Sequence, residues 1–114
     1  MVPRANPRPG TFKRACPVRD GQGMRIGGVR YEEVQGVILF DGQFGIWMTG
    51  TGMWELTHGG TGRYIGTRSS QNRAIALAER LVEIDLPWDA KTKKDWYARA
   101  RKDLLAKAND EIRG

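Results

Sequence analysis

Cysteine and histidine are almost absent from this sequence, and this limits the chemistry that it can support. The 114 residues include one cysteine, Cys16, and one histidine, His58. A single cysteine excludes an internal disulfide, and the two residues together fall short of the four ligands of a structural zinc site. We therefore expect neither a metal ion nor another cofactor.

Long apolar runs are also lacking. The longest covers residues 37–40, whereas a helix that spans a bilayer needs about 20 apolar residues. Residues 1–10 contain arginine and proline but no apolar segment of the kind that a secretory signal requires. We expect a cytoplasmic protein that has no membrane partner.

Groupings of catalytic residues are equally scarce. His58 ends an expected strand beside a glycine turn, and the spacing suggests no nucleophile paired with it. A lone histidine is more often a hydrogen-bonded structural residue than a general base. The glycine-rich segments 50–52 and 59–62 lack the lysine and hydroxyl residue of a phosphate-binding loop, and hairpin turns explain them better. The sequence therefore predicts a protein without enzymatic activity.

Positive charge, in contrast, is abundant and unevenly distributed. The formal net charge is +6, and the sequence pI is about 9.9. Residues 1–30 carry a net +6, residues 31–90 carry −4, and residues 91–114 carry +4. A basic balance concentrated at the chain ends favours an acidic partner, although basic proteins can also be merely soluble.

The N-terminal residues 1–23 combine prolines, glycines and basic side chains with little apolar content. Such a composition is typical of a segment without a packed structure of its own. We predict a flexible basic arm over residues 1–23 and a single domain over residues 24–114.

An α+β fold is indicated for this domain. One or two short strands are expected over residues 24–34, turned at the glycines 27–28, and Asp41-Gly42 between apolar runs is a strong hairpin signal. Strands ending at His58 and starting at Tyr64 flank the turn at 59–62. The sequence predicts an antiparallel meander sheet of four or five strands.

Two C-terminal helices are expected to pack against this sheet. Ser69 or Ser70 can cap a helix over residues 70–84, which Pro87 follows. Thr92 and Asp95 have the spacing of a capping box, and the helical periodicity after them continues to residue 112.

The aromatic residues leave two interpretations open. Most of them are expected to fill the core, because large side chains bury much apolar area in a small domain. Alternatively, one or two face outward and stack on bases. The residues concerned are Phe40, Phe44, Trp47, Trp54, Tyr64, Trp88 and Trp96.

Residues 63–67, Arg-Tyr-Ile-Gly-Thr, and the alanine-rich helix over 69–81 resemble a strand and helix of three-stranded-sheet DNA-binding domains. These include the plant ethylene-response-factor domain and the arm-type-site domain of tyrosine recombinases, and the chain is also similar in character to small phage or mobile-element accessory proteins. The resemblance implies a sheet that enters the major groove. Because residues 37–48 carry no basic side chain, we place the contacts on Arg63, Arg68 and the arm.

The sequence thus predicts a nucleic-acid-binding protein, with DNA as the expected partner. The alternative is a phage- or mobile-element-encoded interaction module that modulates an acidic host protein. The expected nucleic-acid-binding residues are Arg4, Arg8, Lys13, Arg14, Arg25, Arg30, Arg63, Arg68, Lys91, Lys94, Arg101 and Lys102.

Overall fold

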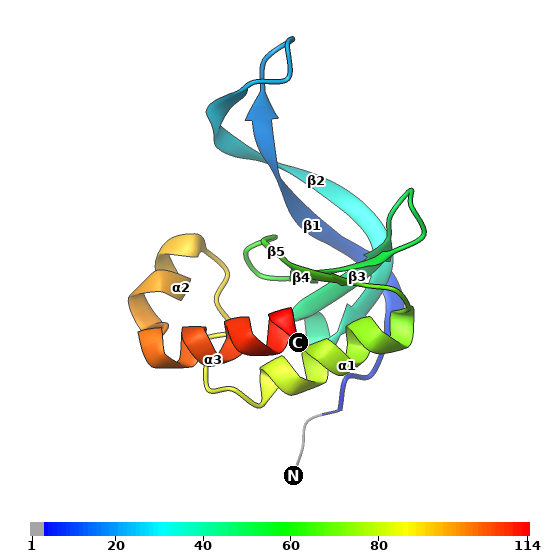
Figure 1. The fold of residues 1–114 in the computed structure, drawn as a ribbon, viewed down its shortest axis with the longest axis vertical. Helices are drawn as coiled ribbons and strands as arrows, with labels where there is room; N and C mark the ends of the chain where they lie inside the picture. The colour runs from blue at the N-terminus through cyan, green and yellow to red at the C-terminus, as the bar shows by residue number, and fades with distance from the viewer. Residues whose placement is uncertain (1–3) are drawn as a thin grey trace.

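The computed structural model describes residues 4–114, apart from the side chains of residues 17, 19 and 25 (Figure 1). Within this part of the chain, five antiparallel strands form one sheet in sequence order. The strands are β1 (Arg8–Arg19), β2 (Arg25–Leu39), β3 (Phe44–Met48), β4 (Trp54–His58) and β5 (Tyr64–Arg68). The helices that follow are α1 (Gln71–Val82), α2 (Lys93–Arg99) and α3 (Lys102–Arg113). The predicted α+β fold, with a meander sheet and C-terminal helices, is confirmed.

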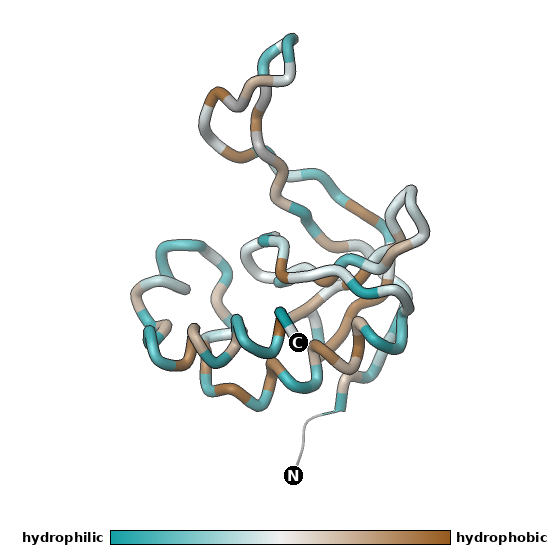
Figure 2. The backbone as a smooth tube through the Cα atoms, in the orientation of Figure 1, coloured by the Kyte–Doolittle hydropathy of each residue, from teal (hydrophilic) through white to brown (hydrophobic). Residues whose placement is uncertain are grey.

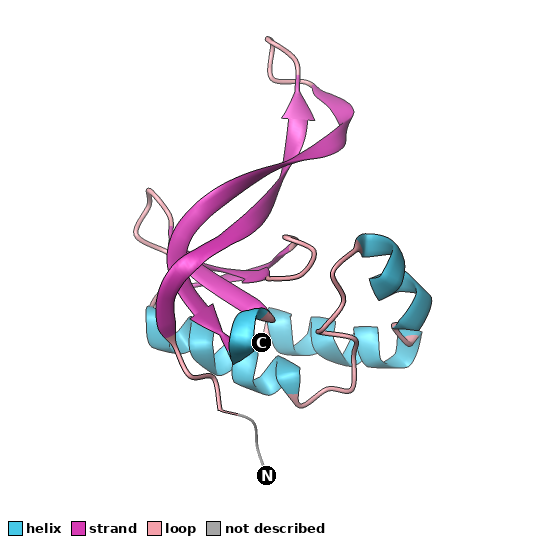
Figure 3. Ribbon diagram, turned by 180° about the vertical axis from the view of Figure 1, so that it is seen from behind, coloured by secondary structure: helices cyan, strands magenta, loops and turns pink. Residues whose placement is uncertain are grey.

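The main core lies between α1 and one face of β3 and β4. Side chains alternate across a strand, so Phe44, Ile46 and Leu56 share this face, and each is at most 1% exposed. Helical spacing turns Leu77 and Leu81 of α1 toward them. Figure 3 shows the helices gathered along one end of the strongly twisted sheet. The burial predicted for this helix is confirmed.

The start of α1 also follows the expected pattern. The Ser70 hydroxyl accepts a hydrogen bond from the backbone N–H of Arg73, 3.2 Å away. Such a cap satisfies one of the N–H groups that a helix leaves unpaired at its first turn.

The N-terminal segment differs from the prediction. Residues 8–19 are not a flexible arm, because they pair with β2 from Arg8↔Ile38 to Arg19↔Arg25. The boundary placed at residue 23 therefore falls in the turn of a hairpin. Proline was misleading here, since an edge strand tolerates it where the missing N–H would point away from the partner strand. Pro9 and Pro17 are an even number of residues away from Ala15, whose N–H points away from β2. Their backbone nitrogens therefore also point away from β2.

Strand β2 is longer than the sequence suggested. The glycines 27–28 do not turn the chain; they lie inside one 15-residue strand, with φ of 88° and 75°. The turn lies earlier, where the Asp20 carboxylate accepts hydrogen bonds from the N–H groups of Gln22 and Met24, both at 2.9 Å. The distal part of the β1–β2 hairpin extends well beyond the body of the domain, and Figure 2 shows hydrophobic residues along it.

The sheet curls so that its two ends meet. The backbone N–H of Ala15 in β1 donates to the Gly62 carbonyl in the β4–β5 turn, at 2.8 Å. Inside the curl, the Arg14 guanidinium reaches Glu55 of β4 at 3.4 Å and lies over the Trp47 ring. The hairpin base is therefore fixed against the opposite end of the sheet.

The expected second helix over residues 92–112 is two helices. Ala100 and Arg101 are extended, with ψ of 125° and 137°, and they separate α2 from α3. The physical reason is that Trp96 is buried against Trp88, whereas the apolar stripe of α3 packs beside α1. One straight helix could not direct Trp96 toward Trp88 and the apolar stripe of residues 102–113 toward α1 at the same time.

Candidate nucleic-acid interface

The glycine turn at residues 59–62 is where separate parts of the fold meet. A Cβ atom on Gly59 would collide with the backbone carbonyl of Gly42, and one on Gly60 would collide with that of Ala90. Gly62 has φ of 75°, and its Cβ position lies 3.1 Å from the backbone nitrogen of Ala15. Glycine is needed because three backbone segments approach this turn closely.

Basic residues from three segments surround this turn. The pKa of His58 is lowered first by burial and then by the charges of Arg63, Lys91 and Lys13, against an opposing hydrogen bond to Trp88. The backbone geometry places them at the same turn: the Lys13 carbonyl oxygen is 3.3 Å from the Cβ position of Gly62, the Lys91 Cα is 3.4 Å from that of Gly60, and Arg63 directly follows the turn. The three residues come from β1, the β4–β5 turn and the α1–α2 connection. All three side chains are exposed.

Two exposed tyrosines lie under two of these cations, Lys13 and Arg63. The Lys13 Nζ atom is 5.0 Å from the centre of the Tyr31 ring, and the Arg63 guanidinium is 5.4 Å from that of Tyr97. Arg63 also donates to the Tyr97 hydroxyl at 2.7 Å, and Lys93 lies 5.9 Å from the same ring. Tyr31 is 57% exposed and Tyr97 is 52% exposed. We call Lys13, Tyr31, Arg63, Lys91, Lys93 and Tyr97 the basic–aromatic surface.

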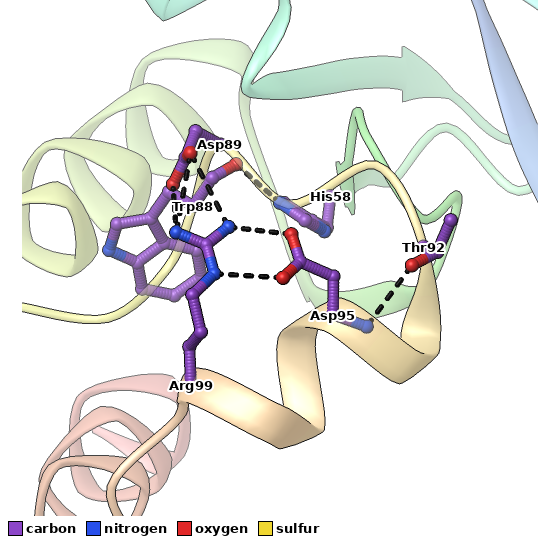
Figure 4. A network of polar contacts seen from close by, with 6 residues as sticks. All are labelled: His58, Trp88, Asp89, Thr92, Asp95 and Arg99. Carbon is purple, nitrogen blue, oxygen red and sulfur yellow. Dashed lines mark hydrogen bonds and ion pairs between the residues drawn. The ribbon is translucent and has the colours of Figure 1, made fainter.

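Among the described residues, the cations of this surface make no ion pair with a carboxylate, although Glu33 lies opposite Lys13 in the β1–β2 ladder and the charge of Lys91 contributes to lowering the pKa of Asp89. Within residues 4–114, no ion pair involves any of its four cations, which are Lys13, Arg63, Lys91 and Lys93. Asp89 and Asp95, the nearest acids on the same segment, are both occupied by Arg99, with an Nη2–Oδ2 distance of 2.7 Å to Asp95 (Figure 4). An incoming anion would therefore not have to displace an internal partner from these cations.

His58 has a structural role in this arrangement. Its Nε2–H donates to the Trp88 carbonyl at 2.7 Å (Figure 4). This leaves Nδ1 to accept from the Thr61 hydroxyl at 2.7 Å. Both ring nitrogens are occupied, and the ring is 4% exposed. The neutral imidazole joins the glycine turn to the α1–α2 connection.

A cavity of about 290 Å³ opens beside the basic–aromatic surface. It lies between the β4–β5 hairpin, the α1–α2 connection, α2 and α3. The lining residues are His58, Thr61, Arg63, Tyr64, Ile65, Leu86, Trp88, Trp96, Tyr97, Leu105, Ala108, Asn109 and Ile112.

Some of the predicted binding residues are committed to internal contacts. Arg14 pairs with Glu32 at 2.8 Å and with Glu55, so its charge is largely neutralised. Arg68 donates to the Ile112 carbonyl at 2.6 Å, which satisfies the last turn of α3. Arg101 pairs with Asp103 on the surface at 2.8 Å.

The remaining predicted residues are spread over the surface. Five predicted binding residues are exposed outside the basic–aromatic surface: Arg4, Arg8, Arg30, Lys94 and Lys102. Arg4 shares a second hollow with Lys91. Arg25 is in β2, and its side chain lies outside the described residues. The structure thus brings Lys13, Arg63 and Lys91 together.

The sequence analysis missed Tyr31, Tyr97 and Lys93. In one continuous helix over residues 92–112, Tyr97 would lie on the apolar stripe, and the break after α2 removes it from that stripe. Tyr31 pairs with Ala15 across the β1–β2 ladder, so Lys13 is its diagonal neighbour. Recognition of residues 8–19 as a strand would have shown this contact.

Comparison with protein-family models, with curated proteins and with solved structures finds no match to this chain. Over residues 4–114, none of the helices combines the length and apolar character that crossing a membrane requires. The surface chemistry described above is therefore the basis for a functional proposal.

Proposed function

We propose that this chain is a non-enzymatic protein that binds nucleic acid, with DNA as its expected partner. The observation that carries the proposal is the basic–aromatic surface, where cations from separate segments meet at the glycine turn beside two exposed tyrosines. Phosphates supply the negative charge that such cations favour, and bases supply ring faces for the tyrosines.

The β1–β2 hairpin supports the same proposal. It is a two-stranded ribbon that projects from the body (Figure 1), and a ribbon of this kind fits the major groove of B-DNA. Arg8 and Arg30 are exposed on it, and Met24, Ile26 and Val29 are exposed toward its tip. Basic side chains would position the backbone, and apolar ones could contact base edges or wedge between base steps.

An electrophoretic titration tests the proposal with duplex DNA, single-stranded DNA and RNA at two salt concentrations. The informative variant replaces Lys13, Arg63 and Lys91 by glutamine. The matched control removes the same charge from exposed positions elsewhere, at Arg73, Lys107 and Arg113. If each of the three cations neutralises one phosphate, the first variant should flatten the log–log salt dependence of binding to duplex DNA by about 2.7.

The control variant should keep most of the parent's affinity and salt dependence. Equal losses in both variants would show that net charge, rather than this surface, drives binding. If no nucleic acid binds at moderate salt, the proposal is wrong, and capture of a discrete acidic protein by the tagged chain would instead support an interaction module.

A further inference from the structure

We infer that the cavity beside the basic–aromatic surface accepts a single unpaired nucleobase. The inference rests on the proposed function and adds to it a substrate class, which is nucleic acid with at least one base free of its pairing partner. It is supported by the lining of the cavity, by its size and by its position.

The floor of the cavity is aromatic. Trp88 and Trp96 have ring centres 5.1 Å apart, and His58 lies 5.3 Å from Trp96, with the rings tilted against one another. Both tryptophans line the cavity, and each is at most 9% exposed, so a base would contact the small accessible part of each ring. Every base has a flat ring face, and contact with aromatic side chains is the usual way in which proteins hold an unpaired one.

The size of the cavity favours one base over a larger ligand. Its volume of about 290 Å³ is at the lower limit of small-molecule sites, which begin near 300 Å³. A nucleobase is a single flat ring system, whereas a dinucleotide cofactor would exceed the space. The sugar and phosphate of the bound nucleotide would remain outside.

The polar groups at the cavity are suited to such a nucleotide. Arg63 borders the cavity and lies over the Tyr97 ring, so a cation is available beside the cavity for the phosphate of the bound nucleotide. None of the lining residues is Asp or Glu. The Asn109 side-chain amide makes no hydrogen bond among residues 4–114, and it offers both a donor and an acceptor to a base edge.

The break between α2 and α3 creates this space. Tyr97 of α2 and Asn109 of α3 can border one cavity only because the chain turns at Ala100. The Arg99 side chain, which pairs with Asp95 within α2, also reaches Asp89 and so joins α2 to the α1–α2 connection (Figure 4). The cavity is therefore part of the folded architecture.

A base inside a duplex cannot reach this cavity without being extruded, which costs unstacking and unpairing energy. The parent protein should therefore bind a short single strand about tenfold or more tightly than a fully paired duplex of the same length, at equal salt. That factor corresponds to about 1.4 kcal/mol, within the range for stacking of one base on aromatic side chains.

The test uses a single-stranded oligonucleotide that contains 2-aminopurine, whose fluorescence falls on stacking, together with unlabelled single-stranded and duplex competitors. Asn109→Trp adds bulk to the lining, and Asn109→Asp adds a negative charge to a site that has none. Both changes are at an exposed residue. Asn72→Trp and Asn72→Asp are the matched controls, because Asn72 is an exposed residue of α1 that does not border the cavity.

We expect fluorescence quenching with the parent and with both Asn72 variants, and a loss of affinity of about tenfold with both Asn109 variants. Binding of duplex and single strand with equal affinity, unchanged in the Asn109 variants, would overturn this inference and leave the proposed function standing. Absence of binding to either probe would overturn the proposed function as well.

Discussion

Gly60 is the position at which a single methyl group should disturb the fold most directly. A Cβ atom there would collide with the carbonyl oxygen of Ala90, and the Cα of Lys91 would be 3.4 Å away. The obstacle is backbone rather than the end of a flexible side chain, so the α1–α2 connection must move away from the glycine turn. We therefore predict that Gly60→Ala is strongly destabilising.

The magnitude follows from a comparison with Gly50, in the β3–β4 turn. A Cβ on Gly50 meets nothing within 4 Å, and its φ is not in the left-handed region. Replacement by alanine there should stabilise the fold by about 0.4–1 kcal/mol, because it restricts the unfolded chain. Overpacking at Gly60 should cost about 1–3 kcal/mol. The two variants should differ by roughly 1.4–4 kcal/mol in the free energy of unfolding.

Denaturant titration followed by tryptophan fluorescence measures this difference. On thermal denaturation the gap should be about 4 °C for each kcal/mol in a chain of this size. Gly60→Ala should also weaken nucleic-acid binding, since Lys91 would move away from Lys13 and Arg63. If Gly60→Ala and Gly50→Ala unfold at the same midpoint, the close approach at this turn is not a constraint and the reasoning fails.

Two further predictions concern stability. Leu81→Ala should lower the free energy of unfolding by about 2–5 kcal/mol, because Leu81 is fully buried between α1 and the sheet. An unchanged denaturation midpoint would contradict that packing. Burial lowers the pKa of His58 in the folded state, so the unfolded chain takes up this proton first as pH falls. Stability should therefore decline below the ordinary histidine pKa of about 6.5, by at most about 1.4 kcal/mol per pH unit until the depressed pKa is reached. In His58→Gln, the free energy of unfolding should not show this decline between about pH 7.5 and 5.5. If the free energy of unfolding changes with pH equally in the two proteins, the prediction is wrong.

The local elements that depend on neighbouring residues alone could be predicted from the sequence. The cap at Ser70, the apolar stripe of α1 through Leu77 and Leu81, and the turn at Asp41-Gly42 each follow from a short segment. Their hydrogen bonds and buried faces are formed within a few residues or repeat with a fixed period. Residues 8–19 could not be predicted in this way, since prolines and charges conceal an edge strand that depends on β2 for its hydrogen bonds.

For the candidate site, the sequence by itself determined the supply of charge and the glycine turn. It placed Lys13, Arg63 and Lys91 among the basic residues without relating them to one another. Only the tertiary structure decided which cations gather beside tyrosines and which, like Arg14 and Arg68, are used internally. The physical reason is that these contacts join residues 18 to 44 positions apart in the chain, and a local sequence pattern carries no information about such pairs. The cavity has the same origin, because it exists only where the chain turns at Ala100 and α3 returns toward β5.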